Sequence, residues 1–134
     1  MAKVTGIGGI FLKCADPDAT RDWYKRVLGF EPNEYGGFDF LHSASAAIHP
    51  EGARTIYGLF AADSPYFAPS EAPFMLNLMV DDLEAILARA AGEGVSELQP
   101  RESHAYGTFG WLVAPDGRKL ALWQPASKGR PRSA

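Results

Sequence analysis

The chain repeats one pattern twice, and this repeat is the feature that most constrains its fold. The copies begin near Gly6 and Phe74, and a shift of one on the other aligns Asp16 with Asp82. In each copy an alternating apolar run, typical of a strand, changes to the apolar spacing of a helix. Two copies in one short chain predict paired half-domains that build a single cavity between them.

The predicted helices have clear start and stop signals. Proline at the first helical position and an acidic residue three positions after a capping aspartate are typical starts, and glycine is typical of a left-handed stop. The first helix is expected to start at Asp16-Pro17 and stop at Gly29, and the second to start at Asp81, with Glu84 completing the cap, and stop at Gly94.

Strand-like segments separated by turn residues follow each helix. We predict them at residues 30–33, 38–43 and 54–60 in the first copy and at 96–99, 109–114 and 119–124 in the second. The last two are expected to form a hairpin through Pro115-Asp116-Gly117. Each copy is therefore a predicted βαβββ module of an α+β fold, at 5–61 and 74–125, with a proline-rich linker at 62–73 and a flexible tail at 126–134.

Composition narrows the class of protein. With 134 residues, 46% of them hydrophobic and 22% charged, the chain can bury a real core as a single domain. Its net charge of −3 argues against nucleic-acid binding, and no apolar run suggests a membrane partner or a secretion signal, so we expect a cytoplasmic location. Cys14, the single cysteine, is interpreted as a small buried residue. The basic residues Lys128, Arg130 and Arg132 are expected in a frayed end.

Three pieces of the chain are informative together: DPDATRDWYKRVLGF, MVDDLEAILARAAGEGV and YGTFGWLVAPDGRKLALWQP. They resemble the vicinal oxygen chelate superfamily, which includes glyoxalase I, extradiol dioxygenases, fosfomycin-resistance enzymes and bleomycin-binding proteins. The resemblance implies two tandem βαβββ modules that form a curved mixed sheet around a cleft. It also implies a divalent metal held by up to four His, Gln or Glu side chains on the first and last strands of the modules.

The four positions where the resemblance places metal ligands are Gly9, Gly58, Met75 and Ala121. Glycine and alanine have no donor atom, and a thioether prefers soft metals. We therefore predict a member of the superfamily without metal or other cofactor. A displaced site made from His42, Glu102 and His104 stays open as an alternative to ordinary surface histidines.

Strand alternation predicts which side chains share a face with these four positions. The predicted ligand-binding residues are Phe11, Lys13, Phe60, Asn77, Trp111 and Trp123, with Tyr35 and Tyr106 as further wall candidates. Aromatic walls with a few polar groups are suited to an organic ligand. The alternative for the aromatic residues is packing between the halves or across a dimer, and Lys13 has the alternative of reaching solvent.

The leading functional hypothesis is a homodimeric protein, like the glyoxalase and bleomycin-resistance proteins, that binds a small organic molecule without metal. One alternative is an enzyme of the glyoxalase or dioxygenase type, a lyase or oxidoreductase, with displaced ligands or none. Another is a structural or partner subunit whose cleft is filled by its own side chains. Fold alone does not decide between them.

Overall fold

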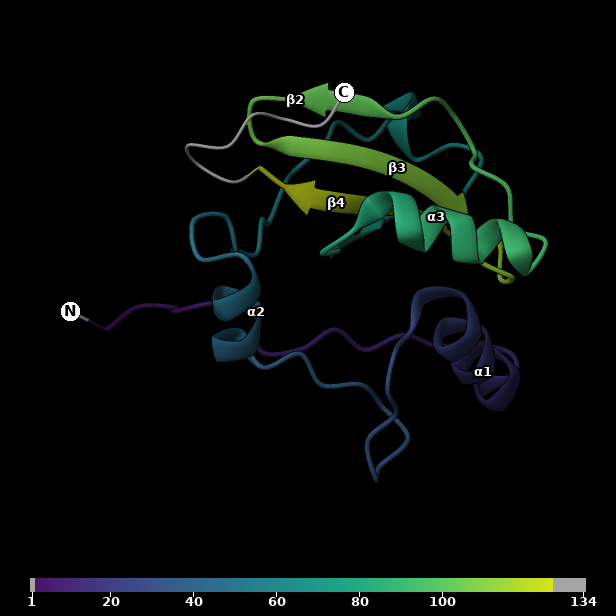
Figure 1. Ribbon diagram of the computed structural model, residues 1–134, viewed down its shortest axis with the longest axis horizontal. Helices are drawn as coiled ribbons and strands as arrows, with labels where there is room; N and C mark the ends of the chain where they lie inside the picture. Colours follow the sequence, from purple (N-terminus) through teal and green to yellow (C-terminus); the bar gives the residue numbers. More distant parts are fainter. Residues whose placement is uncertain (1, 127–134) are drawn as a thin grey trace.

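The computed structural model describes residues 2–126, and its second half forms one four-stranded mixed sheet with the order β1-β4-β3-β2. The strands are β1 (Leu76–Met79), β2 (Glu102–His104), β3 (Gly107–Val113) and β4 (Lys119–Pro125), and helix α3 (Leu83–Gly92) connects β1 to β2 (Figure 1). β1 runs parallel to β4, whereas the other pairs are antiparallel. The predicted α+β class is confirmed, and the second copy is a complete βαβββ unit.

The helix signals of the repeat are reproduced with one correction. In helix α1 (Pro17–Leu28), Asp16 Oδ1 accepts a hydrogen bond from the Ala19 amide at 3.1 Å. The cap of α3 is Asp82, which accepts from the Ala85 amide at 3.1 Å, and not Asp81 as predicted. The reason is that α3 begins one residue later than the sequence suggested, so that Asp82 is the residue directly before the first helical turn, from which a side-chain oxygen reaches the third helical amide.

The core lies where α1 and α3 pack together and against one face of the sheet. Its buried members are Trp23, Tyr24, Val27 and Leu28 of α1, Leu83, Ile86, Leu87 and Ala90 of α3, and Leu112, Ala114, Leu120 and Leu122 of the β3–β4 hairpin. Leu76, Leu78 and Val80 pack against this cluster. The predicted sorting of the second copy into a core face and an opposite face is therefore confirmed.

The β3–β4 hairpin has the predicted turn, but β2 begins later than expected. Gly117 has a φ of 86°, and the Ala114 amide donates to the Arg118 carbonyl at 2.8 Å. The predicted strand at 96–99 makes a bond from the Leu98 amide to the Trp111 carbonyl at 2.8 Å. Pro100, which has no N–H, follows this bond, and regular pairing begins only at Glu102.

The first copy departs from the prediction, because residues 2–75 contain no strand. The segments 2–15 and 53–60 have neither helix nor strand, and only an isolated bridge joins Pro32 to Phe38. Strand-forming sequence becomes a strand only where a partner supplies hydrogen bonds. Here the apolar side chains remain in water, with Phe11 96% exposed and Leu59 87% exposed.

A helix replaces part of a predicted strand in the first copy. Helix α2 (His42–Ile48) takes the end of the predicted strand at 38–43, because its sequence is rich in alanine and favours a helix. The linker contains a short 3₁₀ helix, η1 (Pro65–Phe67). In Figure 1, α1 and α2 lie on one side of the molecule and the sheet lies on the other.

No helix within residues 2–126 is both long and apolar enough to cross a membrane. Cys14 is half-buried, with its thiol free. Except for Ala126, the predicted tail and its basic residues Lys128, Arg130 and Arg132 lie outside the described residues.

Candidate functional site

The candidate site is a pocket of about 290 Å³ on the face of the sheet opposite to α3. We call it the aromatic pocket. Strands β2 and β3 and the turn between them supply most of its wall, and the segment before the linker and the linker itself supply the rest. Its lining residues are Phe60, Tyr66, Glu102, His104, Tyr106, Phe109 and Trp111.

The sheet forms the wall of the pocket because successive residues of a strand point to opposite faces. Phe109 and Trp111 of β3 face away from the core, opposite Trp123 and Ala121 of β4. The ring of Phe109 lies nearly parallel to the rings of Trp111, at 6.0 Å and 17°, and of Trp123, at 6.2 Å and 12°. Small Ala121 opposite Trp111 leaves room for the indole, which is 1% exposed.

Tyr66 brings the linker into the same wall. Its hydroxyl accepts a hydrogen bond from Trp111 Nε1 at 3.1 Å, and its ring stacks on Phe60 at 5.6 Å and 12°. Lys119 Nζ donates to the Tyr66 carbonyl at 2.6 Å. Burial raises the pKa of the Tyr66 phenol, an effect that the Trp111 hydrogen bond opposes.

Glu102 and His104 form the polar end of the pocket. They are two residues apart on β2, so they share one face, and His104 Nε2 lies 3.1 Å from Glu102 Oε1. The imidazole ring stacks on Tyr106 at 5.0 Å and 5°. The pair offers a ligand a hydrogen-bond donor and acceptors beside a flat apolar surface.

The structure brings together only part of the predicted ligand set. Phe60 and Trp111 line the aromatic pocket, whereas Trp123 is not among its lining residues. The Trp123 ring stacks on Phe109, and its Nε1 donates to the Tyr106 carbonyl at 3.0 Å. Asn77 shares the pocket's face of the sheet but lies on β1, at the opposite edge from β2.

The two residues predicted from the N-terminal segment lie apart from the pocket lining. Phe11 is almost fully exposed, and the Lys13 carbonyl accepts from Arg118 Nη2 at 2.9 Å. Tyr35, a further wall candidate, is also exposed and is not among the lining residues. The ligand-binding roles of these residues stay predictions.

Sequence reasoning missed two lining residues, Phe109 and Tyr66. Phe109 stands two positions before Trp111 on the same strand, so alternation already placed it on that face. The signal for Tyr66 was weaker: an aromatic pair, Tyr66-Phe67, in a linker that was interpreted only from its prolines and small residues.

The residues present do not fit the metal that the resemblance implies. Gly9 and Gly58 lie in segments without strands, Met75 precedes β1, and Ala121 is 1% exposed. Within residues 2–126 no group of three or more His, Cys, Asp or Glu side chains has a metal-binding arrangement. Glu102 and His104 are paired, but His42, at the start of α2, does not complete a site with them.

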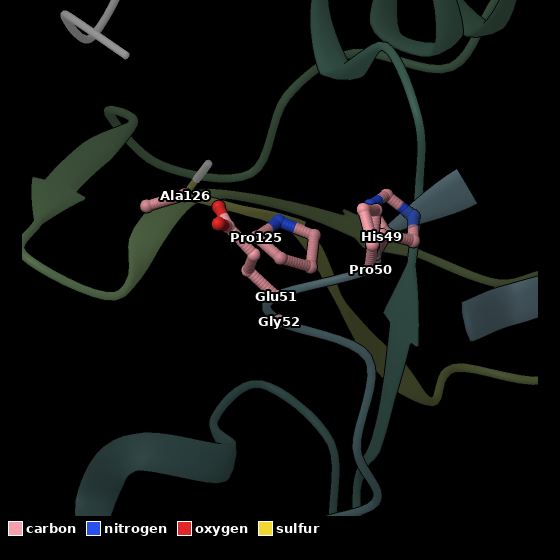
Figure 2. Close-up of a pocket in the computed structure, with 6 residues that line it drawn as sticks. All are labelled: His49, Pro50, Glu51, Gly52, Pro125 and Ala126. Atoms are coloured by element: carbon pink, nitrogen blue, oxygen red, sulfur yellow. The ribbon is translucent and has the colours of Figure 1, made fainter. Parts of the chain in front are cut away.

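A second hollow lies at the end of β4 and is too small for an organic ligand. Its volume is about 20 Å³, which is enough for a water molecule. It lies where the turn after α2 meets β4: a Cβ atom added to buried Gly52 would lie 2.8 Å from Pro125 Cβ. Figure 2 shows its lining residues, His49, Pro50, Glu51, Gly52, Pro125 and Ala126.

Comparisons with solved structures show the fold. An integron cassette protein from the mobile metagenome of V. pseudocholerae has a TM-score of 0.59 and 17% identity, with 95% of this chain and 99% of that chain covered. A similar cassette protein of V. cholerae has a TM-score of 0.58 and 16% identity, with 94% and 99% covered. TnmS3, an antibiotic binding protein from Streptomyces sp. CB03234, has a TM-score of 0.56 and 22% identity, with 94% and 100% covered.

The match to a family profile identifies the family of this chain. No curated protein matches the chain. The family profile described as a glyoxalase-like domain matches residues 9–123, which is most of the chain. This protein therefore belongs to the glyoxalase-like domain family, within the vicinal oxygen chelate superfamily that its helix entries and last hairpin resemble.

Proposed function

We propose that this protein binds a small, planar aromatic molecule in the aromatic pocket, without the divalent metal of its superfamily. The observation that carries the proposal is five aromatic side chains and one Glu–His pair around a volume of about 290 Å³. Flat apolar walls with a few polar groups are the common composition of small-molecule sites. The volume suits one or two fused rings. In this proposal the protein acts in the cytoplasm.

One structural neighbour supports a binding role for the fold. TnmS3 is described as an antibiotic binding protein, so a protein of this fold can hold an organic ligand. The proposal takes only the class of role from that neighbour and takes the ligand class from the pocket of this chain.

Binding of an uncharged aromatic probe with a planar naphthyl group tests the proposal. N-phenyl-1-naphthylamine fluoresces more strongly in an apolar site, and we expect a saturable signal with one site per chain. Phe109→Ala removes the middle ring of the stack and should weaken binding about tenfold, since a lost stacking partner costs roughly 1–1.5 kcal/mol beyond its area. Tyr35→Ala is the matched control, because Tyr35 is 89% exposed, is not among the lining residues and lies outside the segments 2–15 and 53–60. Equal binding by both variants would contradict the proposal.

Metal addition separates this proposal from the alternative of an enzyme with displaced metal ligands. A metal that binds only the folded chain must raise its melting midpoint. We expect no rise with Mn²⁺, Ni²⁺, Zn²⁺ or Fe²⁺. A rise that disappears in His104→Ala would instead favour a displaced metal site built on the Glu102–His104 pair.

We further propose that the chain works as a homodimer in which a second copy covers the first half. That half exposes apolar side chains along strand-like sequence, including Val4, Phe11, Tyr57 and Leu59. Several large apolar side chains exposed along two segments of one half favour an interface there. Strand β1 is an edge of the sheet and offers unpaired backbone groups to a strand-like segment of a partner. A second copy supplies such a segment in a closed two-fold arrangement.

Sedimentation equilibrium tests the dimer. We expect the mass of two chains, and Phe11→Lys should shift the equilibrium toward one, because the substitution places a charge in the buried contact. Lys3→Glu is the control for a change of charge in the same segment at a polar position. A monomer at micromolar concentration would contradict the dimer proposal, but it would not contradict the proposal that the aromatic pocket binds a ligand.

A further inference from the structure

Lys119 is a buried charge that lacks a usual partner. It is the first residue of β4 and is 3% exposed. Within residues 2–126 its ammonium group forms no ion pair with a carboxylate at 4 Å or less. It donates instead to the carbonyl of Tyr66 and lies 4.6 Å from the centre of that residue's ring. A buried ammonium group without an ion pair is costly to a folded chain, so packing alone does not explain a lysine here.

Tyr66, the partner of Lys119, is held at both ends. Lys119 binds its backbone carbonyl at 2.6 Å, and Trp111 Nε1 binds its hydroxyl at 3.1 Å. Phe60 stacks on its ring. The two hydrogen bonds come from neighbouring strands, so they fix both the position of the linker and the orientation of the ring.

We propose that Lys119 is a positioning residue of the aromatic pocket, whose ammonium group holds the Tyr66 segment of the linker in place as a wall of that pocket. This inference rests on the proposed function, because the wall matters only if a ligand uses it. A charge–carbonyl hydrogen bond over an aromatic face combines two favourable interactions in one short contact. Lys119 is not a lining residue, so its effect on a ligand passes through residues that line the pocket. We infer that the main path is Tyr66, to which it is hydrogen-bonded, because the Trp111 ring centre lies farther from Nζ, at 5.9 Å.

The test compares ligand affinity with stability in the same variants. Lys119→Met keeps an unbranched chain and removes the charge, and it should weaken binding of N-phenyl-1-naphthylamine about tenfold. The melting midpoint should not fall, because the lost hydrogen bond is offset by relief of the buried charge. Lys25→Met, on the exposed side of α1, is the matched control and should change neither quantity. A loss of affinity that is accompanied by a lower midpoint would assign Lys119 a structural role and overturn the inference.

A double-mutant cycle tests the path through Tyr66. In a Tyr66→Ala background the change Lys119→Met should no longer alter affinity, since the wall it positions is gone. An equal loss in both backgrounds would show that Lys119 acts on the ligand by another path, and unchanged binding in Lys119→Met alone would also overturn the inference.

A measurement without ligand separates failure of this inference from failure of the proposed function. The Trp111 indole N–H signal, assigned by its absence in Trp111→Phe, reports the bond to Tyr66 by NMR. Lys119→Met should move this signal and speed its exchange with water, and Lys25→Met should not. Because Lys119 Nζ also lies 5.9 Å from the centre of the Trp111 ring, loss of its charge shifts the signal directly, and the exchange rate is the deciding measurement. If the wild type binds no probe but exchange is faster in Lys119→Met, the proposed function fails and the Lys119–Tyr66 linkage holds; an unchanged exchange rate contradicts the linkage itself.

Discussion

Gly107, where β3 begins, decides the shape of the pocket beside Tyr106. Its φ is 138°, and a Cβ atom there would collide with the Gln124 carbonyl and lie 2.5 Å from Trp123 Nε1. Only glycine allows both this backbone conformation and this close approach of the strands.

We therefore expect Gly107→Ala to lower the free energy of unfolding by about 3 kcal/mol, through backbone strain and displacement of the Trp123 indole. Urea denaturation measures the loss. Gly92→Ala is the control, because Gly92 is helical and has open space around it; alanine there should be neutral or stabilise by up to about 1 kcal/mol. Similar effects of the two substitutions would show that Gly107 is not constrained.

Lys119 gives the protein a defined dependence of stability on alkaline pH. Burial lowers the pKa of its ammonium group below 10.5, against a smaller opposing effect of Glu102. The other titratable group against it is the phenol of Tyr66. The partner of Lys119 on β3, Val113, the nearby Trp111 ring and the β1 segment Leu76–Met79 do not titrate. Between the lowered pKa and the unfolded value of about 10.4, the unfolded chain binds more protons, so unfolding becomes harder as the pH rises.

The free energy of unfolding of the wild type should therefore rise relative to Lys119→Met as the pH increases through the lowered pKa toward 10.5. Below the lowered pKa the ammonium group is charged in the folded chain, so the whole cost of burying that charge is present there. Urea melts of both proteins at several pH values measure the difference. A free energy of unfolding of the wild type that stays constant or falls relative to that of Lys119→Met as the pH rises would contradict the assignment. The substitution Tyr66→Phe, made in both the wild type and Lys119→Met, removes the ionisation of the phenol, which would otherwise overlap with that of Lys119.

At the level of elements, the cap of α3 is where the repeat proved a better guide than the local motif. Alignment of the copies paired Asp16 with Asp82, and both cap their helices, whereas the acidic motif pointed to Asp81. We expect Asp82→Ala to lower the free energy of unfolding by about 1 kcal/mol, and Asp81→Ala, an adjacent exposed carboxylate, to change it little. Thermal or urea unfolding distinguishes the two variants. An equal loss of stability for Asp81→Ala would show that Asp81 caps the helix as the local motif predicted.

The elements that could be predicted from sequence are those whose signals are local. The cap of α1, the Gly117 turn and the two faces of β3 and β4 depend on neighbouring residues, and these predictions agree with the structure. The strands of the first copy were predicted by the same alternation but require a partner that the single chain does not supply. Phe109 followed from alternation and Tyr66 did not, because a linker residue is placed by tertiary contacts alone.

For the whole molecule, the two halves of the repeat differ in completeness. The second is a packed βαβββ unit, and the first contributes α1 to the core while its strand-like segments remain in water. A two-fold partner that covers those segments would supply the missing strand contacts and enlarge the wall beside Phe60, which is the lining residue contributed by that half. Ligand binding and assembly are then coupled, because the same segment serves both.

This coupling predicts that thermal stability depends on protein concentration. In a dimer whose two chains stabilise each other, the melting midpoint rises with protein concentration by mass action, and a ligand bound across the contact raises the midpoint further. We expect both effects between 1 and 100 μM chain (roughly the range in which micromolar assembly is visible), measured by calorimetry with and without N-phenyl-1-naphthylamine. Phe11→Lys should remove the dependence on concentration, and Lys3→Glu should keep it. If the melting midpoint of the wild type does not depend on concentration, the dimer proposal is contradicted, because a partner chain then contributes nothing to the stability of the first half.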